Sequence, residues 1–94
     1  MAVMVTIEFP ASSEDYDRVN DSLGDSPDGL IVHTAADLGG KMRVVDMWES
    51  PEKFAAFAEG RLGPKVAEVL GDGAPEPGQP EFQELYNLEV HKTP

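Results

Sequence analysis

The chain contains no cysteine, few basic residues and no long apolar run. Without cysteine there is no disulfide framework, thiol nucleophile or thiolate metal site, which fits a reducing compartment. No stretch approaches the roughly 20 apolar residues that span a bilayer. The first residues, MAVMVTIEF, lack the basic start and the small-residue cleavage site of a signal peptide. These absences predict a cytoplasmic protein with no membrane partner.

Acidic residues outnumber basic ones by 18 to 7, which gives a net charge of −11. The resulting field repels phosphate backbones and anionic lipid, so nucleic acid is not an expected partner. Such a charge is typical of a solvated surface, and a docking face for a basic partner is the alternative. Residues 1–94 are expected to form a single domain. A domain of this size buries only about 60 to 65% of the surface of its unfolded chain, so a lone monomer would be marginally stable.

The period of the apolar residues and the position of turn residues predict four strands and two helices. They are a strand at 3–9, a helix at 13–23 with an apolar stripe of Tyr16, Val19 and Leu23, strands at 30–36 and 42–49, a helix at 51–70 and a strand at 82–90. The stretch DLGGK predicts a glycine hairpin between the second and third strands. Gly63 and Pro64 are expected to break or kink the second helix. Residues 71–80, GDGAPEPGQP, are expected to form a mobile loop.

The element order βαββαβ predicts a ferredoxin-like α+β fold, with a four-stranded antiparallel sheet and both helices on one face. The other face of the sheet still includes apolar side chains, and one chain has nothing left to cover it. We therefore expect a homodimer joined through the open sheet faces, so that the first expected partner is a second copy of the chain.

The stretch VVDMWESPEKFAAF is a third strand that ends in Trp-Glu-Ser and runs straight into a helix opened by Glu-x-x-Phe. In this stretch, and over nearly its whole length, the chain resembles the small antibiotic-biosynthesis-monooxygenase-like members of the dimeric α+β barrel superfamily. The resemblance implies the dimeric barrel, but it covers several activities. They include cofactor-free oxygenases of aromatic polyketides, polyketide cyclases, heme-degrading enzymes, muconolactone isomerases and proteins of no known activity.

The resemblance can be taken further in two ways: it disfavours one of these activities, and it implies candidate substrate-binding residues. Heme-degrading members carry a histidine late in the second helix, and the corresponding stretch RLGPKVAEVL has none, which disfavours heme degradation. The cofactor-free oxygenases use tryptophan, tyrosine, asparagine and arginine in a pocket between sheet and helices. The resemblance therefore implies Trp48, Tyr86, Asn87 and Arg43 as candidate substrate-binding residues.

Alternation along the third strand places Asp46 and Trp48 on one face and Arg43 on the other. An aspartate among apolar neighbours is partly desolvated and suited to proton transfer. The alternative is that Asp46 pairs with a basic side chain or a tryptophan N–H and only satisfies a core polar group. Trp48 is either a core anchor that packs on Phe54 or Phe57, or a flat wall that stacks an aromatic ligand.

His33 lies in the second strand, and the predicted hairpin would bring it near the third strand. A histidine titrates near neutrality and could take a proton from a phenol, although a satisfied core histidine is the alternative. His33 and Asp46 are therefore the candidate catalytic residues. The second histidine, His91, is far along the chain and no His-x-x-x-His spacing occurs, so no metal site is expected. No glycine-rich phosphate loop is present either, and no cofactor is expected.

These residues leave three functions open. The first is a cofactor-free monooxygenase- or cyclase-like enzyme that acts on an aromatic or polyketide-like small molecule by acid and base chemistry in a dry cavity. The second is a non-catalytic dimer that binds a small apolar ligand, and the third is a structural or regulatory module. A cavity reached by His33, Asp46 and Trp48 would favour the first function. A cavity without a placed base would favour the second, and a filled core the third.

Overall fold

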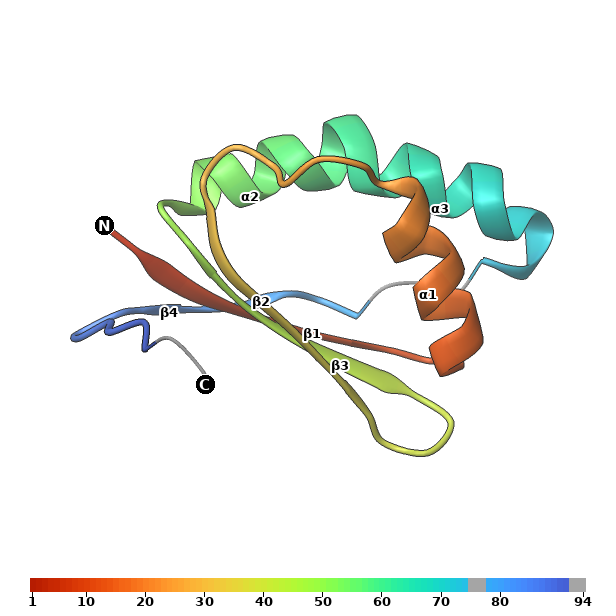
Figure 1. The fold of residues 1–94 in the computed structure, drawn as a ribbon, viewed down its shortest axis with the longest axis horizontal. Coiled ribbons are helices and arrows are strands. Elements are labelled where there is room, and N and C mark those ends of the chain that lie inside the picture. The colour runs from red at the N-terminus through yellow and green to blue at the C-terminus, as the bar shows by residue number, and fades with distance from the viewer. Residues whose placement is uncertain (75–77, 92–94) are drawn as a thin grey trace.

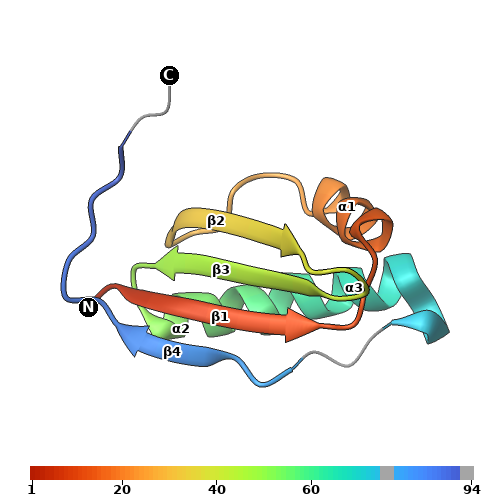
Figure 2. The same ribbon diagram turned by 90° about the horizontal axis from the view of Figure 1, so that it is seen from below.

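The computed structural model describes residues 1–74 and 78–91. Its elements are β1 (Val3–Phe9), α1 (Ser13–Ser22), β2 (Leu30–Asp37), β3 (Met42–Trp48), α2 (Pro51–Phe57), the π-helical segment η1 (Ala58–Leu62), α3 (Gly63–Leu70), the short 3-10 helix η2 (Gly71–Gly73) and β4 (Glu81–Glu84). The strands form one antiparallel sheet in the order β2-β3-β1-β4. The helices lie on one face of it (Figure 1), and the other face is open (Figure 2). The predicted ferredoxin-like α+β fold is confirmed.

Serine side chains start the first two helices of the chain. At α1, the Ser12 hydroxyl oxygen accepts a hydrogen bond from the backbone N–H of Asp15 at 3.1 Å. At α2, Ser50 accepts from the backbone N–H of Lys53 at 3.2 Å, and Pro51 occupies the first turn, where its missing N–H costs nothing. Both helix starts agree with the sequence prediction.

The predicted hairpin between β2 and β3 is present. Its two central residues, Gly39 and Gly40, have φ angles of 78° and 94°, a left-handed conformation that glycine adopts without steric cost. The backbone N–H of Leu38 donates to the carbonyl of Lys41 at 2.8 Å and closes the turn. This turn sets the register of β2 on β3 and therefore decides which side chains of the two strands meet.

The expected break at Gly63 and Pro64 is absent, because α2, η1 and α3 continue as one coil (Figure 1), although the π-helical segment η1 interrupts the regular α-helix just before Gly63. Proline inside a regular helix lacks a donor and collides with the carbonyl four residues earlier. Here the backbone N–H of Gly63 instead bonds to the carbonyl of Ala58, five residues earlier. The wider π turn just before Pro64 makes room for its ring, so the helix can cover the full length of the sheet.

The C-terminal part differs from the prediction in length. The fourth strand covers Glu81–Glu84 rather than 82–90. Leu85 still donates its N–H to the carbonyl of Ala2 at 3.0 Å, but β1 begins at Val3, and beyond this point the chain has no strand to pair with. Residues 85–91 therefore leave the sheet beside the N-terminus (Figure 2).

The predicted loop at 71–80 includes η2, and residues 75–77 lie outside the described part, so its mobility stays a prediction. Within residues 1–74 and 78–91, none of the helices has the length and apolar character needed to cross a bilayer.

The hydrophobic core lies under α2, at one end of the space between sheet and helices. Its buried members are Val3, Val5, Trp48 and Phe54. The Trp48 side chain is fully buried, with ring centroids 5.6 Å from Phe54 and 5.5 Å from Phe57. Trp48 is therefore the core anchor that one of the two sequence interpretations describes. The remaining space between the layers is not filled by this cluster.

Candidate functional site

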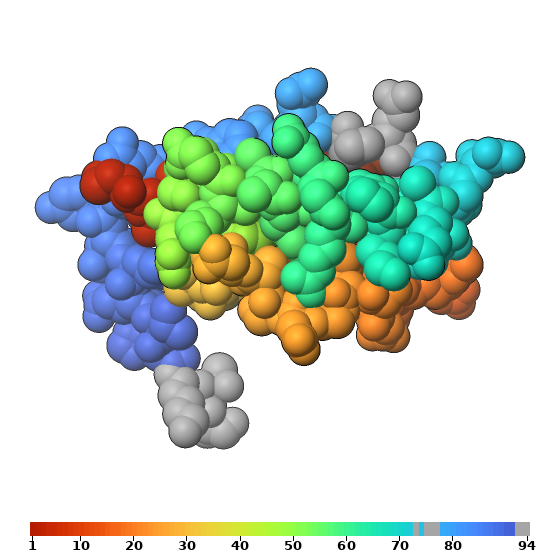
Figure 3. Space-filling view, turned by 90° about the horizontal axis from the view of Figure 1, so that it is seen from above, coloured from red at the N-terminus to blue at the C-terminus, as the bar shows by residue number. Residues whose placement is uncertain are grey.

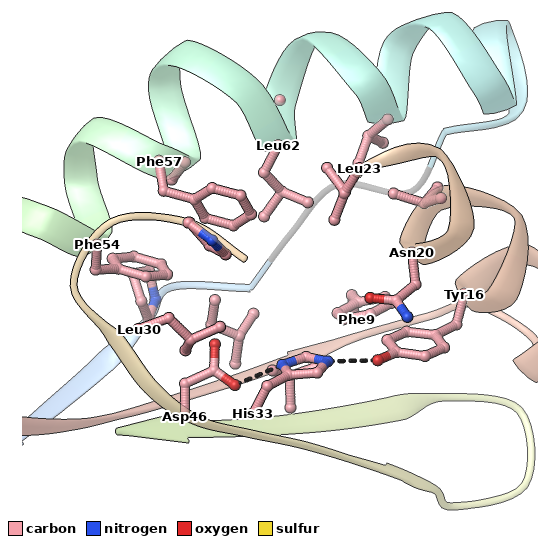
Figure 4. A pocket seen from close by; sticks show the side chains of 18 of the residues that line it. Phe9, Tyr16, Asn20, Leu23, Leu30, His33, Asp46, Phe54, Phe57 and Leu62 are labelled. Carbon is pink, nitrogen blue, oxygen red and sulfur yellow. Dashed lines mark hydrogen bonds and ion pairs between the residues drawn. The ribbon is translucent and has the colours of Figure 1, made fainter. Parts of the chain in front are cut away.

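A cavity of about 610 Å³ occupies that remaining space, between the covered face of the sheet and the helices. Cavities that hold small ligands typically measure about 300 to 1,000 Å³. Most of the wall is apolar and comes from all the layers around it, including Ile7, Phe9, Leu30, Phe57, Leu62 and Val66. Figure 4 shows the few polar side chains gathered on the side formed by α1, β2 and β3. The cavity therefore suits an apolar molecule with one polar end.

The polar side of the cavity is a chain of hydrogen bonds. The Trp48 indole N–H donates to Asp46 Oδ2 at 3.2 Å, and Asp46 Oδ1 is 2.7 Å from His33 Nδ1. On the other side of the imidazole ring, His33 Nε2 is 2.5 Å from the Tyr16 hydroxyl. Asp46 is only 6% exposed, whereas His33 is partly open to the cavity (Figure 4). Four side chains from α1, β2 and β3 thus form one connected polar path.

A one-residue irregularity at the start of β2 keeps Leu30 on the same side of the sheet as His33. Leu30 pairs with Trp48 and His33 pairs with Asp46, so β2 uses three steps where β3 uses two. The extra residue, Ile31, forms a β-bulge. Residues three apart on a regular strand face opposite sides, so without the bulge Leu30 and His33 could not both face the cavity. The hairpin register places His33 opposite Asp46, and the bulge lets Leu30 line the cavity on the same side as the imidazole ring.

Hydrogen bonding and burial shift the acid–base behaviour of the path. A carboxylate can only accept, so His33 Nδ1 carries the proton shared with Asp46. This hydrogen bond raises the pKa of His33 above its ordinary value of 6.5, burial acts in the opposite direction, and the Asp46 charge adds to the increase. Burial raises the pKa of Tyr16, and the charges of Asp46 and Asp17 raise it further. Both pKa values are thus raised, so His33 keeps an added proton more readily than a free imidazole does, while Tyr16 loses its proton less readily than a free phenol does.

Tyr16 is a functional candidate that the sequence pattern does not single out. On α1 it belongs to the same apolar stripe as Val19 and Leu23, and all three line the cavity. Asn20, one helical turn after Tyr16, lines the cavity beside it (Figure 4). The signal that could have found Tyr16 is its hydroxyl, because a tyrosine on the covered face of a helix needs a partner across the interior. His33 is that partner.

Arg61 fixes the side wall of the cavity. Its guanidinium group donates to the carbonyl of Leu23 at 3.0 Å through Nε, and also to the carbonyl of Asp25. The same group lies over the Phe57 ring, 5.7 Å from its centroid. These contacts tie the loop between α1 and β2 to η1, and Figure 3 shows this loop lying along the side of the α2–α3 helix. The wall is thereby held by a cation that does not itself line the cavity.

Of the residues predicted from the sequence, the structure brings three together. His33 and Asp46 are directly hydrogen-bonded, and Trp48 both contacts Asp46 and lines the cavity. Asp46 also accepts the tryptophan N–H that its second interpretation requires, since one oxygen bonds Trp48 while the other faces His33. The two interpretations of Asp46 are therefore compatible.

The other three predicted residues do not line this cavity, and their expected place in it is corrected. Arg43 lies on the open face of the sheet, where its Nε donates to Glu8 Oε2 at 2.7 Å. Tyr86 is fully exposed and Asn87 donates to Glu89 at 2.9 Å, both in the segment after β4. Strand alternation turns Arg43 away from the cavity, and the early end of β4 leaves Tyr86 and Asn87 outside the sheet.

The fold and the cavity together define a ferredoxin-like domain with a ligand-sized space between its sheet and its helices. Among solved structures, the chain is similar to the crystal structure of a "putative antibiotic biosynthesis monooxygenase" from Chloroflexus aurantiacus J-10-fl. The TM-score is 0.65 and the identity 14%, over 96% of this chain and 98% of that one. No protein-family model matches the chain, and no curated protein does. At this identity the likeness shows the fold alone, and it agrees with the fold that the sequence resemblance implies.

Proposed function

We propose that this protein is a small cofactor-free enzyme of the monooxygenase or cyclase type, acting on an aromatic or polyketide-like small molecule. The observation that carries the proposal is the His33–Asp46 pair, a base held by a buried carboxylate on the wall of an apolar cavity. The name of the similar solved structure is in line with it.

The chemistry needs only a proton acceptor and a dry cavity. Asp46 orients the imidazole of His33 and stabilises the imidazolium that forms when a substrate proton is taken up. An electron-rich substrate anion can then transfer electrons to molecular oxygen, or attack its own carbonyl group and close a ring with loss of water. The apolar walls exclude water from either reaction.

A second candidate is a non-catalytic dimer that binds the same kind of ligand. It is favoured by the internal satisfaction of the polar wall: among the described residues, no buried side-chain nitrogen or oxygen lacks a hydrogen-bond partner. The third function, a structural or regulatory module, predicts a filled core. A cavity of about 610 Å³ argues against it.

The proposal includes a homodimer. The open face of the sheet carries apolar side chains from β1 and β3 at its centre, namely Met4, Val45 and Met47. Each of them is already partly buried in the single chain, and a second sheet packed on this face would bury them fully. A salt-bridged cluster of Glu8 with Lys41 and Arg43 borders this centre and would lie at the rim of the interface.

The test is turnover of hydroxylated aromatic compounds such as anthrones and naphthols in air. Oxygen uptake is followed with an electrode, and mass spectrometry distinguishes added oxygen from loss of water. We expect His33→Gln to lower turnover by about 100-fold or more, since it removes the proton acceptor. The matched control is His91→Gln, because the His91 side chain is 84% exposed and lies outside the cavity. Equal turnover in wild type and His33→Gln contradicts the proposal, while tight binding without turnover supports the second candidate.

A further inference from the structure

Both ring nitrogens of His33 are already engaged, one by Asp46 and the other by Tyr16. A substrate therefore has no free nitrogen to approach unless Tyr16 moves away. The accessible end of the polar path is the Tyr16 hydroxyl oxygen, on the cavity wall and partly buried. We propose that Tyr16 is the catalytic residue that exchanges a proton with the hydroxyl group of a bound ligand, and that His33 stores that proton without touching the ligand.

The proton transfer balances without any further reactant. The ligand O–H bond breaks and its proton forms a new O–H bond on Tyr16. At the same time the original Tyr16 proton moves to His33 Nε2, 2.5 Å away. The products are a ligand anion and a His33 imidazolium paired with Asp46, while Tyr16 is neutral before and after. Concerted transfer avoids a free tyrosinate, which burial and the nearby carboxylates make unfavourable by raising the pKa of Tyr16.

The charges around the cavity fit the storage of one proton on His33. The other titratable residues in its lining are Asp15 and Tyr16 of α1, Asp25 of the following loop and Asp46 of β3. The lining contributed by α2, η1 and α3 is apolar throughout. Among the described residues that line the cavity, only His33 thus has a side chain that can carry a positive charge. An anion in the cavity is stabilised only when His33 is protonated, which the relay through Tyr16 achieves.

The inference rests on the proposed function. Two optical probes distinguish a failure of the inference from a failure of the proposed function. Nitrobenzene tests whether the cavity takes up an aromatic molecule at all. Its hydroxylated counterpart, 4-nitrophenol, reports proton transfer because only its anion absorbs visible light. We expect both to bind, and the acid dissociation constant of 4-nitrophenol to rise about tenfold on binding to the wild type.

Substitutions assign the effect to residues. Tyr16→Phe keeps the ring and removes the hydroxyl, so it should retain nitrobenzene binding and lose the tenfold shift of 4-nitrophenol. His33→Gln should do the same, because it removes the proton store. Tyr86→Phe is the matched control, since Tyr86 is fully exposed outside the cavity, and it should behave like the wild type.

Three outcomes overturn the inference. They are an unchanged shift in Tyr16→Phe, an unchanged shift in His33→Gln, and wild-type binding of 4-nitrophenol without a shift. In the last case nitrobenzene binding leaves the proposed function standing. Failure of the wild type to bind either probe overturns both. Circular dichroism of each variant shows that its fold is retained, and if Tyr16→Phe fails to fold, His33→Gln decides the question alone.

Discussion

The two faces of β3 carry different chemistry although their residues alternate along a single strand. On the covered face, Asp46 and Trp48 are buried and joined by a hydrogen bond. On the open face, Arg43 is exposed and paired with a surface carboxylate, while Val45 and Met47 form part of an apolar patch that is only half-buried. Successive residues of β3 thus face the cavity on one side of the sheet and the proposed interface on the other. Position along the strand, more than residue type, therefore decides which role a side chain takes.

The largest expected effect is on the covered face. Trp48→Ala should lower the free energy of unfolding by about 3 to 5 kcal/mol, because it empties the centre of the core between Phe54 and Phe57. Urea denaturation measures the change. Met47→Ala on the open face should cost much less in a monomeric sample. A loss for Trp48→Ala no larger than that for Met47→Ala would break the comparison between the two faces.

The next effect concerns Asp46, whose two oxygens each face a donor. Asn has one oxygen and one NH₂ group, so it cannot accept from both Trp48 and His33, and one of these hydrogen bonds is either lost or reversed by a change of the His33 tautomer. We expect Asp46→Asn to destabilise the fold by about 1 to 3 kcal/mol, and to lower turnover as well. The control is Asp21→Asn on the exposed side of α1, which should leave the urea midpoint unchanged. A neutral Asp46→Asn variant would mean that these hydrogen bonds contribute nothing to stability.

On the open face, the expected effect is on assembly. Met47→Lys places a charge in the proposed interface and should weaken self-association by about tenfold or more, or ~1.4 kcal/mol. Sedimentation equilibrium at micromolar concentration measures it, with twice the monomer mass expected for the wild type. Nitrobenzene binding by the variant should persist, since Met47 does not line the cavity. A wild type that sediments as a well-folded monomer would remove the dimer from the proposal.

The smallest effect is the pH dependence of stability from His33. Because its pKa is raised in the folded state, His33 contributes stability that is fully present below its ordinary value of 6.5. That contribution is lost as the pH rises through the raised pKa. The His33 side chain is 34% exposed, so solvent screening keeps the effect small. The urea midpoint should decline as the pH rises from 6.5 through the raised pKa of His33, both in the wild type and in His91→Gln. The same decline in His33→Gln would assign it to another group.

Short-range patterns predict much of this molecule because their causes are local. The serine caps, the Gly39–Gly40 turn and the alternation of β3 depend on residues within a few positions of each other, and the structure has all of them. The pairing of Asp46 with Trp48 is local too, since the two residues are two apart. The meeting of His33 with Asp46 followed partly from the predicted hairpin.

What the sequence pattern misses depends on distant partners. Tyr16 meets His33 across 17 residues, so nothing near Tyr16 distinguishes it from an ordinary core residue. The end of β4 is set by where β1 begins, which is why residues 85–90 keep the alternation of a strand without forming one. The π turn is another case, because proline statistics predict a break and cannot anticipate a widened turn that absorbs the ring.

The bulge at Ile31 also has a consequence for how the length of this chain can vary. If Ile31 is deleted, Val32 follows Leu30 directly, and β2 pairs with β3 residue for residue. His33 then still lies opposite Asp46. The start of β2 is therefore a place where one residue can be gained or lost without disturbing the site. One residue added between His33 and the hairpin has no such buffer, and it would turn the imidazole to the opposite surface. A sequence comparison that tracks this site should therefore allow its gap before the histidine and none after it.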